Sequence, residues 1–380
     1  MIIKAEKAAI ENHSYYYLSI ILSLKREVMV LKVSLMEMNN YPHSHYLNEI
    51  KCIETLKNII DYGKPYVQTI SAMNSQVLTT DKKRTELKTL IKNPLLKDET
   101  KALSLPAKLM YYTILGNMFY LLNDWKKNYL NRKNAVRLLE QNPAYLKNKI
   151  ASYMGNINNL FLAMIRLKKD EELLFLYHKV THFIESLPKK IQSNVVYRWY
   201  IAINNNYIAY KMESLDIAEA LNLSEKLKAS INKYSDKQHF LVFHSNLFVI
   251  CFYLEDYHKA LQQVNEILNT REEKVRQDIF NEAKILNIIV HYELGNEDIL
   301  PGLCKSGFRY FEKKGQLQQA ERLILNFFSK DILKANTKQK KKNIFIELKK
   351  RLLLAMSEKT FYDFDFISWT GSKIENRPFA

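Results

Sequence analysis

A recurring pattern, an apolar helix followed by a polar corner and a second helix, limits what this chain can fold into more than any other feature. The clearest copy is residues 244–268, HSNLFVICFYLEDYHKALQQVNEIL, with its corner at Glu255 and Asp256. Four apolar residues of the second half share one helix face: Ala260, Val264, Ile267 and Leu268. A pair of this kind cannot bury its apolar face alone, so it must stack against neighbouring pairs.

The same pattern recurs four more times along the chain. The corners fall at positions 125, 170, 217, 257 and 297, so successive corners are 45, 47, 40 and 40 residues apart. Some helical repeats have periods in this range. The spacing therefore predicts an array of helix pairs with a period of about 40–47 residues.

The composition favours long helices over a sheet. Only eight glycines and eight prolines occur among the 380 residues. A many-stranded sandwich or barrel needs turn residues every 8–12 positions or so. Hydrophobic residues make up 47% of the chain, which is enough for a folded core. These observations predict an all-α protein.

The arrangement of the corners resembles the tetratricopeptide superfamily, and the chain is similar to a group of bacterial proteins of this type. Three blocks carry the resemblance: residues 111–125 (YYTILGNMFYLLNDW), 280–296 (FNEAKILNIIVHYELGN) and 364–376 (FDFISWTGSKIEN). The superfamily implies a right-handed α-solenoid of antiparallel helix pairs. Its usual period is about 34 residues, so the pairs in this chain would be lengthened. The group implies no particular activity.

We expect residues 1–360 to form a single array and residues 361–380 to dock on its last repeat as a cap. In this C-terminal segment, helical spacing would place Phe361, Phe364 and Ile367 on one face. The alternative is a segment displayed as a ligand motif. Residues 2–12 look like the second helix of a pair whose first helix is missing, so we expect the array to be incomplete at its N-terminus.

The chain is strongly basic, with a formal net charge of +17. A charge of this size is compatible with a polyanion partner. However, the lysines are scattered along most of the expected helices and are not gathered in one block. Scatter favours a diffusely charged, solvated surface, and nucleic-acid binding stays open as the alternative.

Cysteine usage and hydropathy indicate a soluble cytoplasmic protein. Cys52, Cys251 and Cys304 are odd in number and far apart, which favours reduced thiols over a disulfide framework. No run of 18 or more apolar residues is present, so we expect no membrane partner.

The sequence contains no motif for catalysis, cofactor binding or metal binding. A Gly-rich phosphate loop, GxSxG, HExxH and CxxC are all missing. His178 and His182 are four residues apart, but no third ligand lies close in sequence. We therefore expect a protein that is not an enzyme, has no cofactor and holds no metal.

The expected site is the concave face of the array, where first helices would contact a partner. Six residues are candidates for it: Asn117, Tyr120, Asn159, Asn205, Asn246 and Tyr253. Asparagine is a poor former of helix interiors, whereas its amide can bond an extended peptide backbone. A simpler explanation is the high asparagine content of the chain.

Together these patterns predict a non-enzymatic scaffold or adaptor that binds a segment of another protein or a peptide. Two alternatives remain: a basic solenoid that contacts RNA or DNA through phosphates, and a regulatory protein that senses a peptide.

Overall fold

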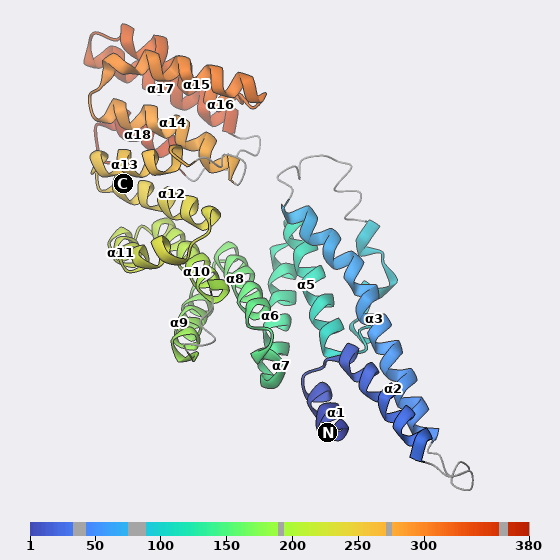
Figure 1. The fold of residues 1–380 in the computed structure, drawn as a ribbon. Helices are drawn as coiled ribbons and strands as arrows, with labels where there is room; N and C mark the ends of the chain where they lie inside the picture. The colour runs from blue at the N-terminus through green and yellow to red at the C-terminus, as the bar shows by residue number, and fades with distance from the viewer. Residues whose placement is uncertain (33–42, 75–88, 189–193, 271–275, 357–363, 380) are drawn as a thin grey trace. The chain divides into compact units, whose positions relative to one another are not determined.

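The computed structural model describes residues 1–32, 43–74, 89–188, 194–270, 276–356 and 364–379. Every regular element in these ranges is helical, and no strand is found there (Figure 1). The prediction of an all-α protein is confirmed. None of the described helices is both long enough and apolar enough to cross a bilayer.

The chain divides into two compact units, residues 1–199 and 200–380, and the division falls within α10 (Asn194–Glu213). The expectation of a single array over residues 1–360 stays a prediction.

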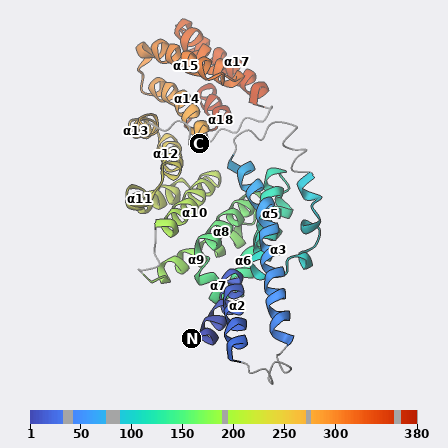
Figure 2. The same cartoon turned by 45° about the vertical axis from the view of Figure 1, so that its right-hand side comes forward.

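The first unit is built from helices that pack against one another in chain order. Its helices are α1 (Ile2–Glu11), α2 (Tyr15–Lys32), α3 (His43–Asn74), α5 (Leu105–Leu121), α6 (Trp125–Glu140), α7 (Pro143–Lys147), α8 (Ile150–Arg166) and α9 (Asp170–Ser186). Short 3-10 turns at Pro94–Leu96 and Glu99–Lys101 precede α5. α2 runs alongside α3, and α5 alongside α6 (Figures 1 and 2).

The second unit is also built from helices that pack against one another in chain order. Its helices are α11 (Ile217–Tyr234), α12 (Lys237–Tyr253), α13 (Tyr257–Leu268), α14 (Gln277–Glu293), α15 (Leu300–Lys314), α16 (Gln319–Asn326), α17 (Lys338–Met356) and α18 (Phe366–Glu375). A 3-10 turn at Glu297–Ile299 leads into α15, and a π-helical turn at Phe327–Asp331 extends α16.

All five predicted corners begin a helical segment, and they share one backbone geometry. The residue two places before each of them adopts a positive φ: Asn123, Lys168, Leu215, Glu255 and Gly295. At the first of these corners, the Asn123 N–H donates to the Tyr120 carbonyl (3.0 Å) and the Asp124 N–H donates to the Phe119 carbonyl (2.9 Å). These two bonds define a Schellman motif, which satisfies carbonyls at the end of the first helix.

A sixth corner of the same geometry joins α1 to α2. His13 has a φ of 50°, and the Ser14 N–H donates to the Ala9 carbonyl (2.9 Å). The sequence pattern did not reveal it, because neither an acidic residue nor a glycine marks it.

Aspartates explain why three of the corners bend at a fixed residue. Asp124, Asp216 and Asp256 are the N-caps of the second helices, and each side chain accepts a bond from the backbone N–H three residues later, at 3.1, 3.4 and 3.1 Å. A carboxylate at this position satisfies a free N–H and interacts favourably with the helix dipole.

The best-defined pair, α12 and α13, has the interior that its pattern predicts. Ala260 and Val264 are completely buried, and Leu247 is 7% exposed. The two helices pack directly against each other.

The helix of the C-terminal segment begins later than helical spacing predicts. α18 starts at Phe366, so Phe364 precedes the helix and does not share a helical face with Ile367. Phe361 lies outside the described residues. Phe364, Phe366 and Trp369 are fully buried, whereas Ile367 is half-buried. The aromatic residues of the segment therefore contribute to the interior of the second unit.

Candidate functional site

Asn117, one of the expected partner-binding residues, lies inside the first unit. It is 3% exposed and belongs to a polar network that links four helices. Its Nδ2–H donates to Thr69 Oγ1 of α3 (3.2 Å), and its Oδ1 accepts a bond from Arg132 of α6. Arg132 also donates to Asn156 Oδ1 of α8 (3.3 Å). The amide of Asn117 therefore holds helices together.

Arg132 is the centre of this network, and its guanidinium is 1% exposed. Among the described residues its guanidinium donates to the amide oxygens of Asn117 and Asn156 and to no carboxylate. Burial lowers the pKa of Arg132 to about 10, so the group stays charged at neutral pH. Its Nε has no hydrogen-bond partner within the described residues. A buried cation without a counterion is costly, which makes its amide partners important.

A glycine makes room for this buried side chain. A Cβ added to Gly116 would lie 2.7 Å from Arg132 Nε, which is closer than packing allows. Asn128 of α6 also bonds this glycine, since its Nδ2–H donates to the Gly116 carbonyl (2.7 Å). The neighbouring residues Gly116 and Asn117 therefore serve one close crossing of α5 and α6.

Asparagines of the second unit join helices in a similar way. Asn246 of α12 donates to the Asn205 carbonyl of α10 (3.0 Å), and Asn205 donates to the His239 carbonyl (3.2 Å). Asn205 is 2% exposed and Asn246 is 7% exposed.

The three asparagines do not display their amides to solvent, and that they bind a partner stays a prediction. Asn117, Asn205 and Asn246 are buried, and their amides bond groups of the same chain. The physical reason is that a buried amide N–H needs an acceptor, and another helix supplies one in each case, although Asn205 Oδ1 has no partner within the described residues. The sequence shows only that asparagine is unusual in a helix interior. It does not show whether the amide faces a partner protein or the next helix.

The other three candidates are half-buried. The Tyr120 ring packs edge-on against Trp125, with 5.4 Å between ring centres. The Tyr253 ring packs against Phe379 of the C-terminal segment at 4.7 Å. That Tyr120, Asn159 and Tyr253 bind a partner stays a prediction.

The C-terminal segment is held on the second unit by two buried acids of α14. The Phe364 N–H donates to Glu282 Oε1 (2.8 Å), and the Trp369 Nε1–H donates to Glu293 Oε1 (2.7 Å). Lys373 forms an ion pair with Glu293 (2.5 Å), whose side chain is 7% exposed.

No chemistry-bearing cluster accompanies these contacts. Among the described residues, no group of three or more His, Cys, Asp and Glu side chains could hold a metal ion. Cys52, Cys251 and Cys304 are buried free thiols, and burial is the main reason that the pKa of each is raised.

The surface feature most typical of an interface is an apolar stripe on α2. Large apolar residues are exposed along this helix at intervals of three or four: Tyr17, Ile20, Leu24, Val28 and Leu31. The opposite face of α2 buries Leu18 and Leu22 in a cluster with Cys52 of α3. The helix is therefore apolar on two faces, whereas a helix that only packs on a core needs one.

α3 carries a second stripe of the same kind. Its exposed apolar residues are Tyr46, Ile50, Ile53, Ile60 and Val67. Their separations of three, four and seven residues place them on one side of the helix. We refer to these two sets of residues as the α2 stripe and the α3 stripe.

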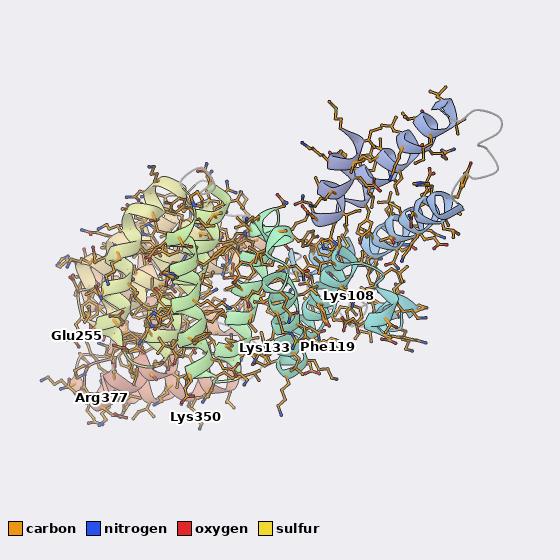
Figure 3. All side chains as sticks on the ribbon, turned by 90° about the horizontal axis from the view of Figure 1, so that it is seen from below. Lys108, Phe119, Lys133, Glu255, Lys350 and Arg377 are labelled. Atoms are coloured by element: carbon orange, nitrogen blue, oxygen red, sulfur yellow. The ribbon has the colours of Figure 1, made fainter. Side chains whose placement is uncertain are left out.

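A basic surface lies on α17. Five cationic residues of this helix are exposed: Lys338, Lys340, Lys342, Lys350 and Arg351. Lys350 projects from the outer side of the helix (Figure 3). The buried side of α17 consists of Phe345, Leu348 and Leu352.

Comparisons of the chain with protein-family models, with curated proteins and with solved structures find no match.

Proposed function

We propose that this protein is a non-enzymatic interaction protein, a right-handed α-solenoid of tetratricopeptide-like helix pairs that binds another protein. The recurring corners support the architecture, since a corner of one geometry is repeated along the chain. The function rests on one observation, the exposed α2 stripe. The proposed setting is a soluble protein of the cytoplasm.

The stripe favours an amphipathic helix of the partner as the bound element. Soluble proteins rarely leave a long contiguous apolar surface exposed unless it binds something. Residues spaced by three and four along α2 match the spacing with which an amphipathic helix presents its own apolar side chains. The buried asparagines offer no such surface, so the apolar stripe is the stronger basis for binding.

The test is capture of partners with a stripe variant. Ile20→Asp with Leu24→Asp places two charges in the centre of the α2 stripe while leaving the buried residues of α2 unchanged. Phe175→Asp on α9 is the matched control, because Phe175 is also an exposed apolar residue (70%) of the first unit. We expect the stripe variant to lose partners that the wild type and the control both retain. Recovery of the same proteins by all three would contradict the proposal.

A second candidate is binding of RNA or DNA, which the basic surface of α17 favours. Lysines that contact phosphates without reading the base sequence bind nucleic acid with dissociation constants of about 10⁻⁴–10⁻⁶ M near physiological salt. We expect titration with single-stranded and duplex nucleic acid to give values in this range. Nanomolar binding at about 150 mM salt that is lost with Lys350→Glu and Arg351→Glu would favour nucleic acid over protein.

A further inference from the structure

A cavity of about 520 Å³ lies within the first unit. Its walls come from the α1–α2 corner, from α3 and α5, and from the junction of α7 and α8. Its volume is in the range of small-molecule sites, which measure about 300–1,000 Å³. Of the α2 stripe, Tyr17 also lines this cavity, whereas Ile20, Leu24, Val28 and Leu31 do not.

Aromatic and apolar side chains form most of its lining. Five tyrosines line the cavity: Tyr15, Tyr16, Tyr17, Tyr66 and Tyr145. Leu109 and Tyr145 are the most buried of the lining residues, at 7% and 4% exposure, so they form its floor. The His13 ring packs edge-on against Tyr145, with 5.5 Å between ring centres. Such a surface suits an apolar or aromatic body.

The floor contains a polar group that a ligand can reach. Tyr145 lines the cavity, although the residue is only 4% exposed. Burial raises the pKa of Tyr145 to about 12, so the hydroxyl keeps its proton and can donate. An acceptor atom of a ligand in the cavity would therefore find a donor in this hydroxyl.

The charge of the lining is positive. Lys149 is the one formally charged side chain among the described residues of the lining, which includes no Asp or Glu. It is exposed at the rim, with its Nζ 5.8 Å from the centre of the Tyr145 ring. Burial lowers the pKa of His13, which favours the neutral form of this ring. α8 begins directly after Lys149 without a side-chain cap, and its N-terminus adds positive potential.

We propose that this cavity binds a carboxylate carried on an aromatic or bulky apolar body, with Lys149 at the carboxylate and the tyrosines around the body. A single cation matches one negative charge. A phosphate ester carries more charge and is typically held by several cationic groups or by arginine.

The proposal can be tested with three probes of one shape and different charge. They are 3-phenylpropionate, 3-phenylpropionamide and 3-phenylpropylamine, titrated into the full chain by calorimetry. Lys149→Met removes the charge and keeps the aliphatic stem. Lys147→Met, an exposed lysine at the end of α7 that does not line the cavity, is the control. Tyr145→Phe removes only the hydroxyl.

We expect binding of the carboxylate alone, reduced about tenfold or more by Lys149→Met and unchanged by Lys147→Met. Tyr145→Phe should weaken binding by a smaller factor. Equal affinity for the amide, no loss with Lys149→Met, or no binding of the carboxylate to a chain with wild-type circular dichroism would each overturn the proposal. The varied cavity residues lie outside the α2 stripe, and the varied stripe residues Ile20 and Leu24 do not line the cavity, so this proposal and the protein-binding proposal fail independently.

The same chemistry can come from a free acid or from the last residue of a peptide. A hexapeptide ending in phenylalanine, with a free or an amidated C-terminus, distinguishes these sources. If the free-ended peptide binds more tightly than 3-phenylpropionate, the peptide is the source. If it binds more weakly, the site takes small acids.

Discussion

One buried charge of the first unit and one of the second, Arg132 and Glu293, are stabilised in opposite ways. In the first unit, the Arg132 guanidinium is surrounded by neutral amides and donates to Asn117 and Asn156. In the second unit, the Glu293 carboxylate pairs with Lys373 and accepts the Trp369 indole N–H. One charge is solvated by dipoles, and the other is neutralised by a counterion.

This difference teaches what each buried charge does for the fold. Glu293 fixes the C-terminal segment, whose sequence is distant from α14, so the ion pair holds together parts that are far apart along the chain. Arg132 joins consecutive helices that already pack closely. We therefore expect the two sites to differ in which part of the protein depends on them.

The largest effect is expected at the C-terminal segment. Trp369→Ala removes a fully buried ring that packs near Phe328 and Phe345, with ring centres 6.0 and 5.7 Å away. We expect a loss of about 3–5 kcal/mol in the free energy of unfolding. Urea unfolding measures it, and hydrogen exchange should show the loss of protection in the second unit. Ile367→Ala, at a half-buried position of the same helix, should cost clearly less.

The second largest loss of stability is expected at Arg132, whose buried charge is solvated by amides. Arg132→Leu leaves the Asn117 and Asn156 oxygens without their donor, which outweighs the relief of an unpaired charge. We expect a destabilisation of about 2–4 kcal/mol, measured by urea unfolding. Arg137→Leu, an exposed arginine of the same helix, is the control and should change stability by no more than about 0.5 kcal/mol. A stable Arg132→Leu protein would show that the amides do not need the cation.

Glu293→Gln separates charge from hydrogen bonding in the second unit. Glutamine still offers an oxygen to the Trp369 N–H, but it leaves Lys373 without a counterion. We expect a destabilisation of about 1–2 kcal/mol, and a larger one for Glu293→Leu, which removes the acceptor as well. If the two variants unfold at the same urea concentration, the ion pair carries the whole effect.

The corners could be predicted from sequence because they are local. An aspartate N-cap and the end of an apolar run lie within a few residues of each other, as at Asp124 and Asp256. The corner at His13 could not be predicted, because neither an acidic residue nor a glycine marks its left-handed residue in the sequence.

The buried network and the cavity could not be predicted, because their residues meet only through packing. Asn117 and Arg132 are fifteen positions apart on different helices, and Tyr15 and Tyr145, which line the same cavity, are 130 positions apart. An unusual asparagine in a helix interior marks a special position, but the sequence does not identify its partner. The α2 stripe is visible in the sequence only as amphipathicity, since exposure depends on what covers the helix.

The smallest expected effect concerns a half-buried charge of the first unit, Glu172 of α9. Its carboxylate accepts bonds from Lys169 Nζ (2.6 Å), from the Tyr129 hydroxyl (2.5 Å) and from Lys133 Nζ (3.0 Å) of α6. Lys133 is marked in Figure 3. These bonds lower the pKa of Glu172 to about 2, and the bond from Lys169 has the largest effect.

The sign of the pH dependence follows from this lowered pKa. The carboxylate stabilises the folded protein above its unfolded pKa of about 4.3, and that contribution is lost as the pH falls towards 2. Because the side chain is 37% exposed, screening limits the contribution to roughly 0.5–1 kcal/mol.

Glu172→Gln should therefore be less stable than wild type by this amount at pH 7, and the difference should shrink between roughly pH 5 and pH 2. Glu171→Gln removes a neighbouring exposed charge and should show no such trend. A Glu172→Gln difference that is constant with pH would mean that packing, and not the charge, sets its contribution, whereas a difference that disappears in acid would place Glu172 with Glu293 as a charge stabilised by counterions.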